Sequence, residues 1–265
     1  MTYLTFILLF VLPAAAGACA LALARTNSLP AGSLHSLIVL SVVALVYTIP
    51  WDRHLILSGV WGYPEGRVIG TFLSIPFEEL AFIFLQTIGV GAWTLHLAGS
   101  PKFEPSLPGS SGERLRFERV RWIGIGCTLQ ITLFGILLLQ IEGARYFGLL
   151  LSWAGPVLLL QVAVGGAILW KLRPIWALGI LPPFLYLCVI DRVAIGSGIW
   201  FFSDNYTSGL RVLGLPLEEA LFFFLTTAMV NQGVLLYTGI LKQWIDRPAA
   251  APGWSHRLAA LYVKP

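Results

Sequence analysis

The chain has 265 residues, of which 57% are hydrophobic and only 11% are charged. A soluble domain carries about 25% charged residues, so this composition excludes an ordinary globular protein. The formal net charge of +4 comes from short loops and does not indicate nucleic-acid binding.

Seven apolar segments are long enough to cross a bilayer, whose hydrocarbon core of ~30 Å requires about 20 helical residues. They cover residues 2–24, 33–51, 69–97, 120–141, 146–170, 174–195 and 210–240. The first segment lacks a basic n-region, so we expect it to stay as a mature span. The sequence therefore predicts an all-α, polytopic membrane protein whose chemistry comes from spans and short loops.

The distribution of Lys and Arg predicts the orientation of the chain. Loops on the side of the N-terminus hold five of the seventeen basic residues, and the other side holds twelve. The positive-inside rule then places the N-terminus outside and the C-terminus in the cytoplasm. We therefore expect a multi-pass protein of the cell membrane.

Polar and aromatic residues recur in the same order in both halves of the chain. The first half has Tyr3, Pro13, Asp52, Arg53, Gly59, Trp61 and 76–79, and the second has Tyr146, Pro156, Asp191, Arg192, Gly198, Trp200 and 216–219. Windows 76–87 and 216–227 share seven of twelve residues. Because the second half starts four spans after the first, both enter the membrane in the same direction, as in parallel repeats.

This recurrence predicts a domain organisation of two three-helix repeats joined by a linking helix. We expect a first repeat at 1–98, a hydrophilic linker with a connecting span at 99–145, a second repeat at 146–241 and a cytoplasmic tail at 242–265.

Each repeat carries two adjacent glutamates in a predicted span: Glu78, Glu79, Glu218 and Glu219. An ionisable residue within a span costs about 2.5–3.5 kcal/mol on insertion scales, and such residues usually face a protein interior and serve function. Burial and a neighbouring like charge favour the neutral carboxyl, which can donate a proton. The structural alternative, in which the glutamates hydrogen-bond across the halves to fix their docking, stays open.

Proline and phenylalanine accompany each glutamate pair. Pro76 and Pro216 lack the backbone N–H that a helix needs, so we expect each helix to kink or loosen there. Phe82 and Phe222 follow the first glutamate of each pair by one helical turn and share its face. An acid beside an aromatic ring suits proton donation followed by stabilisation of a cation over the ring.

Two further recurring pairs have two interpretations each. Asp52 and Asp191 lie near the outer ends of their spans and either serve in catalysis or pair with the arginine that follows each of them. Trp61 and Trp200 either contact a substrate or belong to an aromatic belt at the membrane surface, which we slightly favour.

With these residues in hand, the chain resembles the membrane-integral lycopene cyclases, which occur as two small subunits in actinobacteria and as the cyclase part of fungal fusions with phytoene synthase. The matching segments are Pro50-Trp51-Asp52 with Ile75-Pro76-Phe77-Glu78-Glu79, and Val189-Ile190-Asp191 with Leu215-Pro216-Leu217-Glu218-Glu219. The resemblance covers nearly the whole chain. Phe77, in place of a more usual aliphatic residue, is a mild departure.

The resemblance implies conversion of the linear ψ ends of lycopene to β-ionone rings, through γ-carotene to β-carotene, by acid–base carbocation chemistry without net redox change. It implies lycopene and γ-carotene as substrates, membrane lipid as surroundings, no cofactor or metal, and room for contact with other carotenoid-pathway enzymes. The implied catalytic residues are Glu78, Glu79, Glu218, Glu219, Asp52 and Asp191. The implied substrate-binding residues are Phe82, Phe222, Trp61, Trp200, Pro76 and Pro216.

Other classes of membrane protein fit less well. The sequence contains no G-x-G-x-x-G motif after a predicted strand, so it does not indicate a flavin-binding fold. The four histidines are too scattered for a di-iron cluster. A retinal protein needs a lysine in its last span, and none lies between Lys171 and Lys242. A proton-coupled transporter remains the main alternative, and a non-catalytic carotenoid-binding protein is a third. Ring type and the number of sites stay open.

Overall fold

The computed structural model describes residues 1–25, 29, 32–99 and 111–245. Residues 100–110 of the predicted linker region and nearly all of the predicted tail (246–265) therefore lie outside the described residues. Within them, seven helices are long and apolar enough to cross a membrane, which confirms the all-α polytopic fold. These candidate spans are Tyr3–Leu23, Ser33–Leu57, Phe77–Ala98, Leu115–Leu138, Glu142–Lys171, Arg173–Gly196 and Leu217–Ile240.

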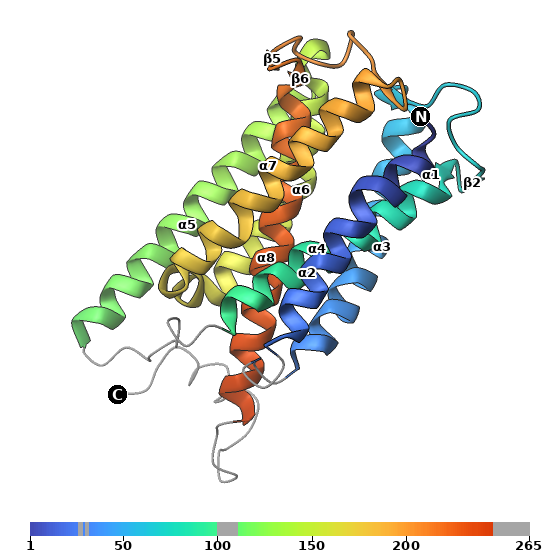
Figure 1. Cartoon of the computed structure of the whole chain (residues 1–265). Coiled ribbons are helices and arrows are strands. Elements are labelled where there is room, and N and C mark those ends of the chain that lie inside the picture. Colours follow the sequence, from blue (N-terminus) through green and yellow to red (C-terminus); the bar gives the residue numbers. More distant parts are fainter. Residues whose placement is uncertain (26–28, 30–31, 100–110, 246–265) are drawn as a thin grey trace.

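The first span is continuous but contains a π-helical segment (Ile7–Val11) between α1 (Tyr3–Phe6) and α2 (Leu12–Leu23). The remaining helices are α3 (Ser33–Leu57), α4 (Phe77–Ala98), α5 (Ser111–Leu138), α6 (Arg145–Lys171, after a 3-10 turn at Glu142–Ala144), α7 (Arg173–Gly196) and α8 (Leu217–Ile245). Figure 1 shows them side by side, with the N-terminus at the end of the bundle that carries the labelled strands.

Helices α4 and α8 form the centre of the bundle. They pack against each other, α4 also contacts α2, α3 and α7, and α8 also contacts α3, α6 and α7. Helix α5 packs along α6 on the outside (Figure 1). The most buried spans are therefore the two that begin with the glutamate pairs.

Short strands at one end of the bundle position these glutamates. Strands β2 (Thr71–Phe72) and β3 (Ile75–Pro76) form one hairpin, and β5 (Arg211–Val212) and β6 (Leu215–Pro216) form another. The first turn has Leu73 and Ser74 at φ 53° and 73°, and the second has Leu213 and Gly214 at 51° and 83°. Positive φ at both central residues is the geometry of a tight two-residue hairpin turn.

The predicted kinks at Pro76 and Pro216 are wrong, because both prolines end a hairpin strand and precede the helix. Helix α4 begins at Phe77, with Pro76 as its N-cap, and α8 begins at Leu217. A proline at a helix start removes no intrahelical hydrogen bond, since the first N–H groups of a helix have no partner there. The glutamate pairs thus lie in the first turn of their spans.

The two halves of the chain make matching contacts. The amide N of Tyr3 donates to Arg67 O (2.9 Å), and that of Tyr146 donates to Tyr206 O (3.0 Å). The phenols also match: Tyr186 donates to Phe10 O (2.9 Å) and Tyr47 to Trp153 O (2.7 Å). Strands β1 (Trp61–Gly62) and β4 (Phe201–Phe202) pair antiparallel with each other, so the loop of one half is joined to the loop of the other.

Candidate active site

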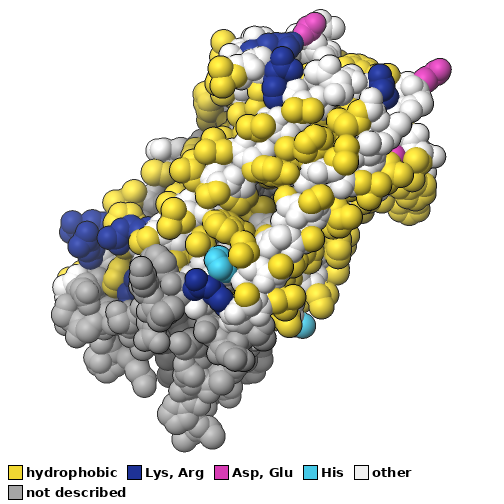
Figure 2. Space-filling view, in the orientation of Figure 1, with side chains coloured by type: hydrophobic (Ala, Val, Ile, Leu, Met, Phe, Trp, Pro, Cys, Tyr) yellow, Lys and Arg dark blue, Asp and Glu magenta, His cyan; other side chains and the backbone are white. Residues whose placement is uncertain are grey.

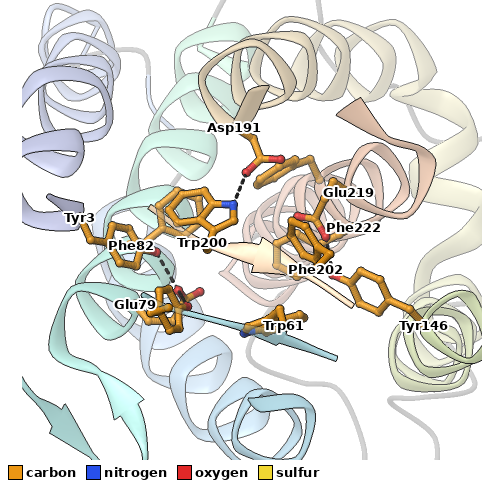
Figure 3. A pocket seen from close by; sticks show the side chains of 12 residues that line it. Tyr3, Trp61, Glu79, Phe82, Tyr146, Asp191, Trp200, Phe202, Glu219 and Phe222 are labelled. Atoms are coloured by element: carbon orange, nitrogen blue, oxygen red, sulfur yellow. Dashed lines mark hydrogen bonds between the residues drawn. The ribbon is translucent and has the colours of Figure 1, made fainter. Parts of the chain in front are cut away.

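A cavity of about 40 Å³ lies between the two halves at the hairpin end of the bundle. At this size it holds no more than a few water molecules. Its lining residues come from both halves (Figure 3): Tyr3, Trp61, Tyr63, Glu79, Phe82, Tyr146, Asp191, Trp200, Phe202, Glu219, Phe222 and Phe223. Three carboxyl groups therefore face one small, mostly aromatic space.

Glu79, in the first turn of α4, is held by two phenols. The hydroxyls of Tyr3 and Tyr63 both donate to its Oε2, at 2.7 and 2.6 Å. Burial, followed by the charge of Glu79, raises the pKa of Tyr63 well above its usual value, so Tyr63 is a protonated donor at neutral pH. Both phenols bond the same carboxyl oxygen, and hydrogen bonds of this kind stabilise a carboxylate.

Glu219, in the first turn of α8, has one phenol partner and a second carboxyl group in the same cavity wall. Tyr146 donates to its Oε1 at 2.5 Å. Asp191 of α7 lines the cavity as well, and its Oδ1 accepts the indole N–H of Trp200 at 3.0 Å. Figure 3 places Asp191 and Glu219 on the side of the cavity opposite Tyr3 and Glu79. Two neighbouring carboxyl groups in a small, mostly aromatic cavity favour a state in which one keeps its proton.

The first glutamate of each pair is in a different position from the one we expected. Glu78 accepts the backbone N–H of Ile69 at 2.8 Å, and Glu218 accepts that of Ser208 at 2.6 Å. Both are buried outside the cavity lining. Each of these hydrogen bonds connects the start of a helix to the loop that precedes it. Phe82, which follows Glu78 by one helical turn, lines the cavity together with Glu79.

Of the two interpretations of the recurring aspartates, pairing with the arginine that follows is not found among the described residues. Asp191 bonds Trp200, while the guanidinium of Arg192 donates to Leu213 O at 3.2 Å. Asp52 is 1% exposed, lies outside the cavity lining, and has no hydrogen-bond partner for either carboxyl oxygen among the described residues. The structure therefore brings only the second aspartate to the cavity.

Each of the two recurring tryptophans packs against a tyrosine of the opposite half of the chain. Trp200 packs on Tyr3 with ring centroids 4.9 Å apart, and Trp61 packs on Tyr146 at 5.6 Å. Both indoles line the cavity, a placement that fits contact with a substrate better than an aromatic belt facing the lipid. Phe82 and Phe222 line it too, whereas Pro76 and Pro216 only set the start of the two helices.

Sequence reasoning missed several residues of this cavity: Tyr3, Tyr63, Tyr146, Phe202 and Phe223. Tyr3 and Tyr146 were visible as a recurring pair, since each precedes a proline by ten residues. No pattern distinguished Tyr63 and Phe202, because their role depends on the pairing of β1 with β4.

The arrangement is suited to moving protons next to an apolar molecule. Carboxyl groups can give and accept a proton, and the surrounding ring faces stabilise a developing cation. Over the described part of the chain, no group of three or more His, Cys, Asp and Glu side chains is arranged to hold a metal ion. The groups that this cavity itself offers for chemistry are thus three carboxyl groups and the phenols and indoles around them.

Comparison with known proteins finds one family profile and several similar proteins. The profile of the lycopene cyclase family matches residues 1–97 and 145–237. A lycopene beta-cyclase of Halobacterium salinarum is 40% identical over 206 residues, which cover 78% of this chain and 83% of that protein.

More distant relatives are fungal fusion proteins. A bifunctional lycopene cyclase/phytoene synthase of Phaeosphaeria nodorum is 34% identical over 80% of this chain and 37% of its own length, and one of Podospora anserina is 34% identical over 75% and 34%. The chain thus spans about a third of these fusions. No solved structure matches.

Proposed function

The chain belongs to the lycopene cyclase family, and we propose that it is a lycopene β-cyclase that converts both ψ ends of lycopene to β-ionone rings, through γ-carotene to β-carotene. The observation that carries this proposal is the cavity between the halves, where Glu79, Glu219 and Asp191 meet a wall of aromatic rings. The Halobacterium relative named lycopene beta-cyclase supports the ring type.

The reaction needs one proton given and one proton taken for each ring. An acid protonates C2 of the ψ end, which leaves a cation at C1. The C5–C6 double bond attacks C1, the C1–C6 bond forms, and the cation moves to C5. A base then removes the proton from C6 to give the β double bond. The product is an isomer of the substrate, so no electrons need to be supplied or removed.

We assign the acid to the Glu219–Asp191 side of the cavity and the base to Glu79. Two phenol donors stabilise Glu79 as a carboxylate, which is the form that accepts a proton. Glu219 has a single phenol donor and shares its side of the cavity with another carboxyl group, an arrangement that favours a retained proton. The acid and base therefore come from different halves of the chain.

Aromatic faces between these groups stabilise the C1 and C5 cations. Trp200, Trp61 and Phe222 line the cavity, and Trp is the best cation–π partner among side chains. With room for only a few water molecules, the cavity also limits capture of the cation by water.

We further propose that residues 1–98 and 146–241 are parallel repeats that build one shared site. The matching phenol and amide contacts of the halves support this arrangement, as does the crossing of Trp61 and Trp200 to the opposite half. A proton-coupled transporter is not favoured, because the family and its relatives are cyclases.

The excess of basic residues away from the N-terminus supports an orientation with the N-terminus and the cavity toward the outer face. A green fluorescent protein fused to the C-terminus should fluoresce, and alkaline phosphatase fused there should be inactive. Active phosphatase with a dark fluorescent fusion would reverse the orientation.

The mechanism is tested with purified protein in liposomes that contain lycopene, assayed in D₂O. Each ring closed should carry one deuterium, at C2, and a reductant should make no difference to turnover. Products without deuterium, or a strict need for a redox cofactor, would contradict the acid–base mechanism.

A further inference from the structure

A second, larger hollow lies on the surface of the bundle between α2, α4 and α7, with a volume of about 330 Å³. We propose that this groove holds the linear polyene chain of the carotenoid substrate while one ψ end reaches toward the carboxyl groups of the catalytic cavity. This inference rests on the proposed function and adds to it the route by which the substrate reaches the site. Figure 2 shows charged side chains at both ends of this face and mainly apolar side chains between them.

The groove adjoins the cavity through a shared cluster of buried side chains. Val11, Leu187 and Ile190 line the groove and belong to the same cluster as Tyr3 and Phe82 of the cavity wall. From Val11 the groove follows α2 to Leu21, ten residues that span ~15 Å of helix. It therefore leads away from the carboxyl groups along the membrane-spanning direction, as the chain of a long substrate must.

The polar side chains that line the groove are already bonded within the protein. Gln86 donates its amide N–H to Thr226 (2.9 Å), Trp93 its indole N–H to Leu178 O (2.9 Å), and Tyr186 its hydroxyl to Phe10 O (2.9 Å). The other lining residues are apolar and uncharged. A polar solute would lose its hydration here without replacement, so the groove suits a hydrocarbon.

Small residues of α2 open this groove. Ala14, Ala15, Gly17 and Ala18 line it, and the repeat places Val157, Leu158, Leu160 and Gln161 at the corresponding positions of α6. A Cβ built on Gly17 would meet no atom within 4 Å. The small residues that open the groove are thus particular to the first repeat.

The affinity of such a groove for a ligand depends mainly on how closely their shapes fit. A substrate that arrives from lipid gains little hydrophobic energy on binding, because lipid tails are as apolar as the groove, so affinity depends on close packing. A side chain that fills the groove should therefore weaken substrate binding and leave the acid and base unchanged.

The test is a size series at Gly17 in liposomes with lycopene. We expect Gly17→Leu, which copies the residue of the second repeat, and the larger Gly17→Phe to raise KM progressively, to roughly tenfold for Phe, with kcat within about twofold. Gly126→Leu and Gly126→Phe are matched controls, because Gly126 also has no neighbour within 4 Å of a built Cβ but lies on α5. Equal KM values for both series would overturn the proposal.

Pigment retention gives a second readout that needs no turnover. Glu219→Gln, purified from lycopene-containing membranes, should keep bound lycopene, and adding Gly17→Phe should release most of it while adding Gly126→Phe should not. Retention unaffected by Gly17→Phe would mean that the groove holds ordinary lipid and would overturn the proposal. Absence of cyclisation by the parent chain would instead reject the proposed function itself.

Discussion

Replacing Tyr63 with Phe tests the environment that we assign to the base. The change removes one of the two phenols that donate to Glu79 and keeps the ring, so packing is preserved. A hydrogen bond to a charged group is worth about 1.5–3 kcal/mol. Because Tyr3 remains, we take the lower value, which corresponds to a fall in kcat of roughly tenfold. Removing both phenols, in Tyr3→Phe/Tyr63→Phe, should cost about 3 kcal/mol, or ~150-fold.

The assay is the initial rate of γ- and β-carotene formation by purified protein in lycopene-containing liposomes, followed by chromatography. Tyr47→Phe is the matched control, because that phenol donates to Trp153 O outside the cavity lining, and its rate should stay within about twofold of the parent. Rates within twofold for the Tyr3/Tyr63 double variant would refute the role of the two phenols and weaken the assignment of Glu79 as base.

Three further outcomes are expected. Burial raises the pKa of Tyr63 in the folded protein, so above about pH 10 the unfolded chain loses the phenol proton before the folded protein does. The free energy of unfolding should therefore fall above this pH, and it should fall less steeply in Tyr63→Phe. Asp191→Asn should keep the bond to Trp200 yet slow cyclisation by roughly a hundredfold, as loss of a general acid does. Gly155→Leu should lower the free energy of unfolding by about 1–3 kcal/mol, because a Cβ there would overlap Thr132 of α5; thermal unfolding in detergent measures it.

Much of the fold could be predicted from the sequence because the bilayer imposes simple rules. Apolar segments of about 20 residues identify spans, and all seven predicted spans correspond to helices. The start of the two central helices could not be predicted in this way. Residues 69–76 and 210–216 are nearly as apolar as the helices that follow, but two-residue turns at Leu73 and Leu213 fold them into hairpins.

The sequence pattern indicated which helices carry the candidate carboxyl groups, but not which of these groups line the cavity. The glutamate pairs mark the right end of α4 and α8, but a sequence pattern could not separate the member that fastens a loop, Glu78, from the member that faces the cavity, Glu79. Adjacent helical residues point about 100° apart, so the choice depends on the hairpin that sets the start of the helix. The phenol partners were missed because Tyr63 reaches Glu79 through a loop.

The most direct test is pigment analysis of bacteria that accumulate lycopene and express the parent chain, Glu79→Gln, Glu219→Gln or Glu78→Gln. Blots of the membrane fraction confirm equal expression. We predict β-carotene with the parent and with Glu78→Gln, in which the amide oxygen still accepts the N–H of Ile69, and unconverted lycopene with the two cavity variants. Unchanged lycopene with the expressed parent, or full conversion by Glu79→Gln and Glu219→Gln, would contradict the account.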